Sequence, residues 1–160
     1  MSSILHHFSR TVLCNICIFA QKIQVAEKPQ KNYNGLLAVS EHAEEINQDL
    51  TLQKDMVSFI YQHYPEKISL NDIAAAGHVG RSKCCQIFKH YMQQSPVDFL
   101  NAYRLKISCQ LLCTTQKSIT EIAMLCGFNH LSYFSKYFAE CYGCIPREYR
   151  ILHKHETLLT

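Results

Sequence analysis

Two groups of polar side chains, about fifty residues apart, share the same spacing. The first group contains Ser82 and Gln86, and the second contains Ser132 and Lys136. Residues four apart lie on one face of a helix, and short polar or cationic side chains on such a face can reach base edges and phosphates in a DNA major groove. A solvated helix face would have the same composition, so a single group would not indicate binding. Further polar or cationic residues lie beside these two groups: Arg81, Lys83, His130 and Ser135.

Cationic residues are concentrated in the same part of the chain. The 160 residues carry a net charge of +3, but residues 51–160 contain twelve basic and eight acidic side chains. Within residues 78–106, five basic side chains accompany a single acid, Asp98. A cationic surface attracts phosphate backbones, so we expect this region to form one. Its basic members are Arg81, Lys83, Lys89, Arg104 and Lys106.

Two Cys-x-x-Cys pairs, Cys14–Cys17 and Cys141–Cys144, have the spacing of metal-binding or redox motifs. The chain has nine cysteines, an odd number, and most lie within helical patterns. That distribution is typical of a reducing cytosol, where thiols act as small apolar side chains. Because nothing in the sequence brings the two pairs together, we expect no metal and no cofactor. A thiol- or metal-responsive regulator that uses these pairs stays an alternative.

Catalytic motifs are missing from the sequence. It contains no G-x-S-x-G, no Gly-rich phosphate loop and no paired carboxylates on one helix face, so we expect no enzyme. No apolar run approaches the roughly 20 residues of a membrane helix. A helical interaction module, using an apolar stripe over residues 4–25 as its interface, is a further alternative and predicts oligomers without DNA affinity.

Helix signals dominate from Leu50 onward. Hydrophobic residues make up 48% of the chain and charged residues 18%, which favours a folded domain. An apolar stripe from Leu52 to His63 is ended by Pro65, and Ser95–Pro96 predicts the start of a helix that runs to about Leu112. No segment shows the alternation of a strand, so the expected fold class is all-α.

An internal repeat organises these helices. The segment Ser69–Ala74 (SLNDIA) aligns with Ser118–Ala123 (SITEIA), and both begin with a capping-box pattern. Each copy continues through a turn with a glycine, Gly77 or Gly127, into a second helix, as in a helix-turn-helix. The second helices have matching apolar stripes that we expect to face the core: Cys84, Ile87, Phe88 and Tyr91 in one, and Phe134, Tyr137, Phe138 and Cys141 in the other.

The helix between the copies predicts their separation. At 1.5 Å per residue it is roughly 25 Å long, so the two second helices could lie about 34 Å apart, one turn of DNA. The chain could then reach two successive major grooves on one side of a duplex. A rigid connecting helix would require the DNA to bend.

The second copy contains a long motif, from Ile122 (IAMLCGFNHLSYFSKYF) through Gly143 to Arg150 (GCIPREYR). It resembles the signature of AraC/XylS-type transcriptional regulators, and the similarity extends over residues 51–151. The resemblance implies a bacterial transcription factor with two helix-turn-helix subdomains joined by a long linker helix. One departure is His78, at a turn position where the family usually has glycine, and a positive φ is expected there.

The resemblance also implies which residues contact DNA. In the first subdomain they are Arg81, Ser82, Cys85 and Gln86, and in the second they are His130, Leu131, Ser132 and Lys136. The helical phase supports this set except at Cys85 and Leu131. Phosphate contacts are expected from the helix N-termini near Ser69, Ser95, Ser118 and Pro146.

The expected organisation has three parts. Residues 1–48 form an N-terminal helix and a polar linker, the remnant of a sensor or dimerisation domain; residues 49–153 form the DNA-binding domain; residues 154–160 form a tail. A stand-alone short regulator is the alternative. We expect double-stranded DNA and RNA polymerase as partners, a homodimer through the N-terminal helix, no membrane association and a cytoplasmic location. Activation or repression stays open.

Overall fold

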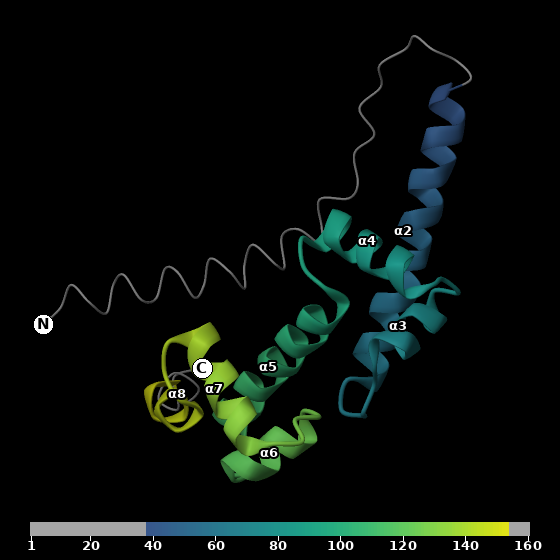
Figure 1. The fold of residues 1–160 in the computed structure, drawn as a ribbon. Coiled ribbons are helices and arrows are strands. Elements are labelled where there is room, and N and C mark those ends of the chain that lie inside the picture. Colours follow the sequence, from purple (N-terminus) through teal and green to yellow (C-terminus); the bar gives the residue numbers. More distant parts are fainter. Residues whose placement is uncertain (1–37, 154–160) are drawn as a thin grey trace, which may run out of the picture. The chain divides into compact units, whose positions relative to one another are not determined.

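The computed structural model describes residues 38–153, with side chains for residue 44 and residues 46–153. The chain divides into two compact units, residues 1–39 and 40–160, and all contacts below lie within the second. The N-terminal stripe at residues 4–25, the Cys14–Cys17 pair and the 154–160 tail lie outside the described residues. The described part is all-helical, as predicted. Its helices are α2 (Ala38–His63), α3 (Leu70–Ala76), α4 (Arg81–Met92), α5 (Pro96–Thr114), α6 (Ile119–Leu125), α7 (Leu131–Tyr142) and α8 (Pro146–His153) (Figure 1).

Helix α2 is longer than the sequence predicted. Residues 39–49 were expected to form a polar linker with at most a short helix of its own, and they instead continue the helix that carries the Leu52–His63 stripe. The stripe buries Met56 and Ile60 completely. Because a helix propagates more easily than it nucleates, the packed second half of α2 can support its polar first half. The predicted boundary at residue 49 falls inside this helix and stays a prediction.

The first helix-turn-helix consists of α3 and α4, packed against α2. Ser69 accepts a hydrogen bond from the backbone N–H of Asp72, and the Asp72 carboxylate accepts the N–H of Ser69, which confirms the capping box. The turn lies close to α2, since a Cβ on Gly77 would lie 2.8 Å from Met56 Cγ. In α4 the predicted stripe is buried at Cys84, Ile87 and Phe88.

Helix α5 joins the two subdomains. Ser95 caps it and Pro96 occupies its first turn, as expected, although the helix continues two residues past Leu112. It packs against α3 and α4 on one side and against α6 and α8 on the other (Figure 1). Phe99 and Leu105 are buried along its length. The linker helix is therefore part of the core rather than an exposed rod.

The second helix-turn-helix repeats the first with one difference in its core. Ser118 and Glu121 form the predicted capping box, and Phe134 and Phe138 are fully buried in α7. Cys141, which the sequence placed on the buried stripe, is exposed, and Tyr142 is buried instead. Phe134, Phe138 and Tyr142 are spaced four residues apart and lie on one side of α7. The ring centroids of Phe138 and Tyr142 are 4.6 Å apart. Aromatic contact selects this neighbouring position for the core.

The two turns have equivalent backbones built from different residues. His78 has a φ of 53°, and the equivalent Gly127 has a φ of 81°. The positive φ expected at His78 is therefore confirmed. An L residue in this region is strained by its Cβ, whereas glycine is not.

Candidate DNA interface

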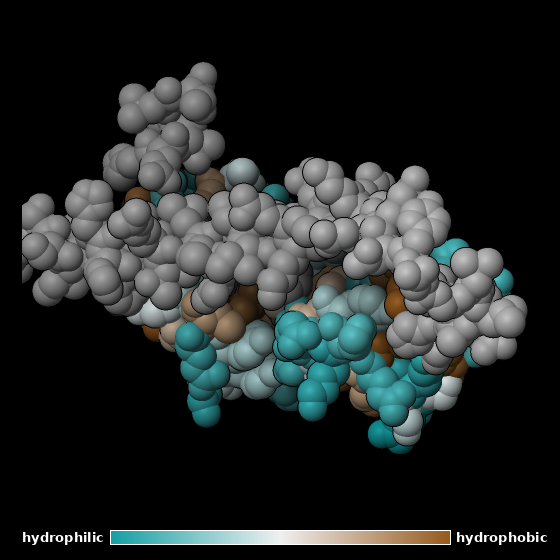
Figure 2. Space-filling view, turned by 90° about the horizontal axis from the view of Figure 1, so that it is seen from above, coloured by the Kyte–Doolittle hydropathy of each residue, from teal (hydrophilic) through white to brown (hydrophobic). Residues whose placement is uncertain are grey.

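The candidate contact residues lie on the outer faces of α4 and α7. Opposite the buried stripe of each helix, seven of the eight are exposed and Cys85 is half-buried. Hydrophilic side chains project along one edge of the described surface in Figure 2. The exposed residues are Arg81, Ser82 and Gln86 on α4, His130 directly before α7, and Leu131, Ser132 and Lys136 on α7.

The N-termini of α4 and α7 differ from those of the other capped helices. The residues before them, Gly80 and His130, make no side-chain capping hydrogen bond, and neither first turn contains an acid. The first N–H groups of a helix have no partner within it and carry a partial positive charge. These two helix starts can therefore accept an anion without displacing a carboxylate of the chain itself.

Carboxylates already occupy the helix N-termini where the sequence predicted phosphate contacts. Asp72, Asp98 and Glu121 lie in the first turns of α3, α5 and α6, and Glu148 accepts the N–H of Ile145 directly before α8. Hydrogen bonds from Ser69 lower the pKa of Asp72, and those from Ser118 lower the pKa of Glu121. Because these groups keep their negative charge at neutral pH, they oppose phosphate binding at the same helix ends.

Two members of the predicted cationic cluster do not lie on an open surface. Arg104 is buried, and its guanidinium donates to two backbone carbonyls. Lys83 forms an ion pair with Asp49 of α2, with Nζ 2.9 Å from Oδ1. The count of charges along the sequence did not reveal these contacts, because each partner is more than thirty residues from Arg104 or Lys83 in the chain. The exposed members of the cluster are Arg81, Lys89 and Lys106.

Helix α7 also carries an exposed aromatic ring that was not among the predicted DNA contacts. Tyr133 is 50% exposed and stacks on Tyr137, with ring centroids 5.9 Å apart. Asn101 Nδ2 lies 3.5 Å from its hydroxyl oxygen. This contact links the start of α7 to α5. The sequence shows that Tyr133 and Tyr137 are four residues apart, but it does not show that Asn101 of α5 lies beside Tyr133.

Three of the described thiols, Cys84, Cys109 and Cys126, are core side chains. Burial raises the pKa of Cys84 and Cys126 to about 11 and that of Cys109 to about 12. Burial also raises the pKa of Cys141 and Cys144. Protonated thiols are weak nucleophiles and poor metal ligands. Among the described residues, no group of three or more His, Cys, Asp or Glu side chains is arranged to hold a metal ion.

The fold and the two exposed helix faces define a class of protein. Two helix-turn-helix subdomains, each with a second helix whose polar face and N-terminus are open, form a double helix-turn-helix DNA-binding domain. A family model described as a helix-turn-helix domain matches residues 73–151.

Known proteins of similar sequence and structure agree with this class. YdeC of Bacillus subtilis, an uncharacterized HTH-type transcriptional regulator, is 38% identical over 97 residues, which cover 61% of this chain and 33% of YdeC. A crystal structure of a transcriptional regulator from Chromobacterium violaceum, with an AraC-type DNA-binding domain, matches with a TM-score of 0.62 at 31% identity. The match covers 65% of this chain and 93% of that one.

The DNA-binding domain of AdpA, solved in complex with a target DNA, shares the fold. Its TM-score is 0.63 at 23% identity, over 68% of this chain and 97% of that domain. The chain belongs to the AraC-type family of DNA-binding transcription regulators, as its motifs indicated. The family consists of regulators and not of enzymes. The chain spans about a third of the length of the curated relatives it matches.

The described helices have no membrane-spanning candidate, since none is both long enough and apolar enough to cross a bilayer.

Proposed function

We propose that this chain recognises a bipartite DNA site, with α4 in one major groove and α7 in the next. The observation that carries the proposal is the duplication of one arrangement. Each of the two helices buries one stripe in its own subdomain, exposes a polar face and begins without a carboxylate cap. A single exposed helix face would not indicate DNA binding. Two matched faces in one chain favour recognition of two DNA segments.

The side chains on each helix suit different contacts. Gln86 can pair with the N6 and N7 atoms of adenine, Lys136 can donate to guanine O6 and N7, and Leu131 can contact a thymine methyl group. Ser82, Cys85, His130 and Ser132 complete the two surfaces. Arg81 lies at the first position of α4, where its charge adds to that of the open helix N-terminus. We therefore assign phosphate contacts to the starts of α4 and α7.

The remaining parts of the proposal concern the whole protein. We propose RNA polymerase as a partner, a cytoplasmic location and a homodimer formed through the N-terminal segment. Residues 1–48 would be the remnant of a sensor or dimerisation domain, residues 49–153 the DNA-binding domain and 154–160 a tail. The relatives support only the DNA-binding part, since the similarity covers 33% of one relative and 38% of another.

Selection of binding sites from a random duplex library, repeated at two salt concentrations, tests bipartite recognition. We expect an enriched motif of two short blocks about 10 bp apart, with affinity that falls as salt rises. A single block would overturn recognition by two helices. Salt-sensitive binding without any enriched sequence would overturn base recognition and leave a non-specific DNA binder.

Two substitutions assign the blocks to their helices. Gln86→Ala should weaken selection in one block only, and Lys136→Ala in the other only, each by about 1–3 kcal/mol of discrimination. Arg81→Ala should weaken binding to all sequences and reduce the salt dependence by about one phosphate contact. Lys54→Ala, which removes an exposed cation on α2 outside the cationic cluster, is the matched control. Loss of selection in the same block from both substitutions would contradict the assignment.

A further inference from the structure

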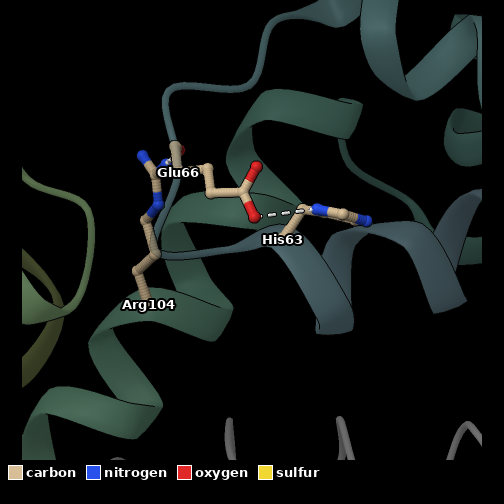
Figure 3. A network of polar contacts seen from close by, with 3 residues as sticks. All are labelled: His63, Glu66 and Arg104. Carbon is tan, nitrogen blue, oxygen red and sulfur yellow. Dashed lines mark hydrogen bonds and ion pairs between the residues drawn. The ribbon is translucent and has the colours of Figure 1, made fainter.

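Arg104 lies near the middle of α5 and is only 8% exposed. Its Nε donates to the carbonyl of Tyr64 at 2.7 Å, and its Nη2 donates to the carbonyl of Glu66 at 2.8 Å. Both carbonyls belong to the loop between α2 and α3, which is part of the first subdomain. In Figure 3 the guanidinium lies against Glu66, and the Glu66 carboxylate turns toward His63.

The same guanidinium also contacts the second subdomain. Its carbon lies 5.9 Å from the ring centroid of Phe128, in a cation–π arrangement. A Cβ on Gly127 would lie 2.9 Å from two guanidinium nitrogens and 2.6 Å from the Tyr64 carbonyl oxygen. The loop of the first subdomain and the turn of the second therefore meet at Arg104, and glycine permits that approach.

The loop on the first side is also restricted near the end of α2. His63 Nδ1 lies 2.9 Å from Glu66 Oε1, so the Glu66 side chain returns to the end of α2 while its carbonyl faces Arg104. The α2–α3 loop also contains Pro65, whose ring restricts the backbone. These features, which do not involve Arg104, limit the positions that the two acceptor carbonyls can take.

The chemistry of arginine suits this position. A planar guanidinium can donate through two nitrogens at fixed angles and keep its face over an aromatic ring. Lysine has a single ammonium and cannot do both. Burial lowers the pKa of Arg104, yet arginine stays protonated at any physiological pH. The buried charge is compensated by carbonyl dipoles and a ring, with contributions from both subdomains.

We propose that Arg104 is a positioning residue that fixes the two recognition helices relative to each other and so sets the spacing of the DNA blocks that the protein accepts. The proposal rests on the bipartite site proposed above. In this proposal, α5 by itself would let each subdomain pivot about its own contacts with that helix. A bridge across the middle of α5 removes this freedom, because one side chain holds a loop of one subdomain and the turn of the other.

The test uses the whole chain and a series of duplexes that carry the two selected blocks. The blocks are placed at the selected spacing and at spacings one and two base pairs longer or shorter, and duplexes with one block are included. One base pair shifts a block by about 3.4 Å and rotates it by roughly 35°. We expect the unsubstituted protein to lose about tenfold in affinity for each base pair of shift.

Arg104→Lys should flatten this dependence to about threefold or less per base pair, since the two subdomains can then adjust separately. Affinity for single-block duplexes should stay within about twofold of the unsubstituted protein. Arg150→Lys is the matched control. Arg150 also donates to a backbone carbonyl, that of Lys117 at 2.6 Å, but both residues belong to the second subdomain. This variant should keep the steep dependence.

Several outcomes would overturn the proposal. A folded Arg104→Lys variant that keeps the tenfold penalty would show that α5 alone sets the spacing. Loss of single-block affinity equal to the loss on two blocks would show a merely structural role. If Arg104→Lys does not fold, Phe128→Leu removes the ring from one side of the bridge and must show the same flattening. A flat dependence in the unsubstituted protein would instead refute the bipartite site itself.

Discussion

The two helix-turn-helix subdomains share a backbone plan but differ in their cores. The second is rich in aromatic contacts: the Phe138 ring touches those of Phe134, Tyr142 and Tyr149. The first buries aliphatic and thiol side chains around Phe88, whose ring contacts that of Phe99 of α5. Aromatic pairs add about 0.5–1.5 kcal/mol beyond the burial of their area. Ring contacts therefore stabilise the buried side of α7 more than the buried side of α4.

Their outer faces differ in the opposite sense. Helix α4 carries two exposed cations, Arg81 and Lys89, besides Lys83, which is paired with Asp49, and it has no acid. Helix α7 has a single lysine, Lys136, which lies 3.9 Å from Glu140. The outer face of α4 thus has the stronger electrostatic attraction for a phosphate backbone, whereas the core beneath α7 has more ring contacts. In a duplicated fold, the buried and the exposed positions can therefore diverge separately, because buried side chains stabilise the subdomain and exposed side chains contact a partner.

The largest expected effect concerns the cores. Phe138→Ala should lower the free energy of unfolding by about 3–5 kcal/mol, since the side chain is fully buried among rings. Phe88→Ala, also fully buried, should cost less because fewer rings surround it. Chemical denaturation of both variants measures the difference. An equal or larger loss from Phe88→Ala would remove the contrast between the cores.

A second comparison concerns the glycines of the two turns. Gly127→Ala should cost about 2–4 kcal/mol, because it combines a positive φ with a clash against the Tyr64 carbonyl. Gly77 has a φ of −92°, and its added Cβ would meet the flexible side chain of Met56. Gly77→Ala should therefore cost at least about 1 kcal/mol less. Thermal or chemical denaturation that gives similar losses for both would refute the difference in strain.

A smaller effect of opposite sign is expected at His78. A non-glycine residue at positive φ costs about 1–2 kcal/mol, and glycine itself loses about 0.5–1 kcal/mol in backbone entropy. His78→Gly should therefore stabilise the protein by about 0.5–1 kcal/mol, whereas His78→Ala should not. A stability gain from alanine equal to that from glycine would show that the imidazole, and not the backbone, is responsible.

The smallest expected effect is the contribution of the two capping-box carboxylates to the loss of stability in acid. The pKa values of Asp72 and Glu121 lie below their ordinary values of 3.8 and 4.5 in the folded protein. Their stabilisation is therefore present above those ordinary values and is lost as the pH falls through the lowered ones. Unfolding measured between pH 5 and pH 3 should show a shallower acid decline in the variant Asp72→Asn/Glu121→Gln. An unchanged decline would assign it to other groups.

Local signals predicted much of the fold and of the site. The capping boxes at Ser69 and Ser118, the proline start of α5 and the repeat of apolar residues depend on neighbours within one or two helical turns. The exposed faces of α4 and α7 follow from the same periodicity. Sequence reasoning failed at Cys141, because two adjacent positions both fit the stripe and only packing against the rings of Phe138 and Tyr149 selects Tyr142. It also underestimated the helix over residues 39–49, because their polar composition does not show that they continue a packed helix.

The all-α class, the duplicated helix-turn-helix and the family to which the chain belongs can be read from the sequence, because each depends on short-range spacing. Which charges are available depends on how the helices pack. Arg104 and Lys83 look like surface cations in sequence, yet one joins the two subdomains and the other holds α4 to α2. Their partners lie more than thirty residues away, and such contacts exist only after the helices have packed.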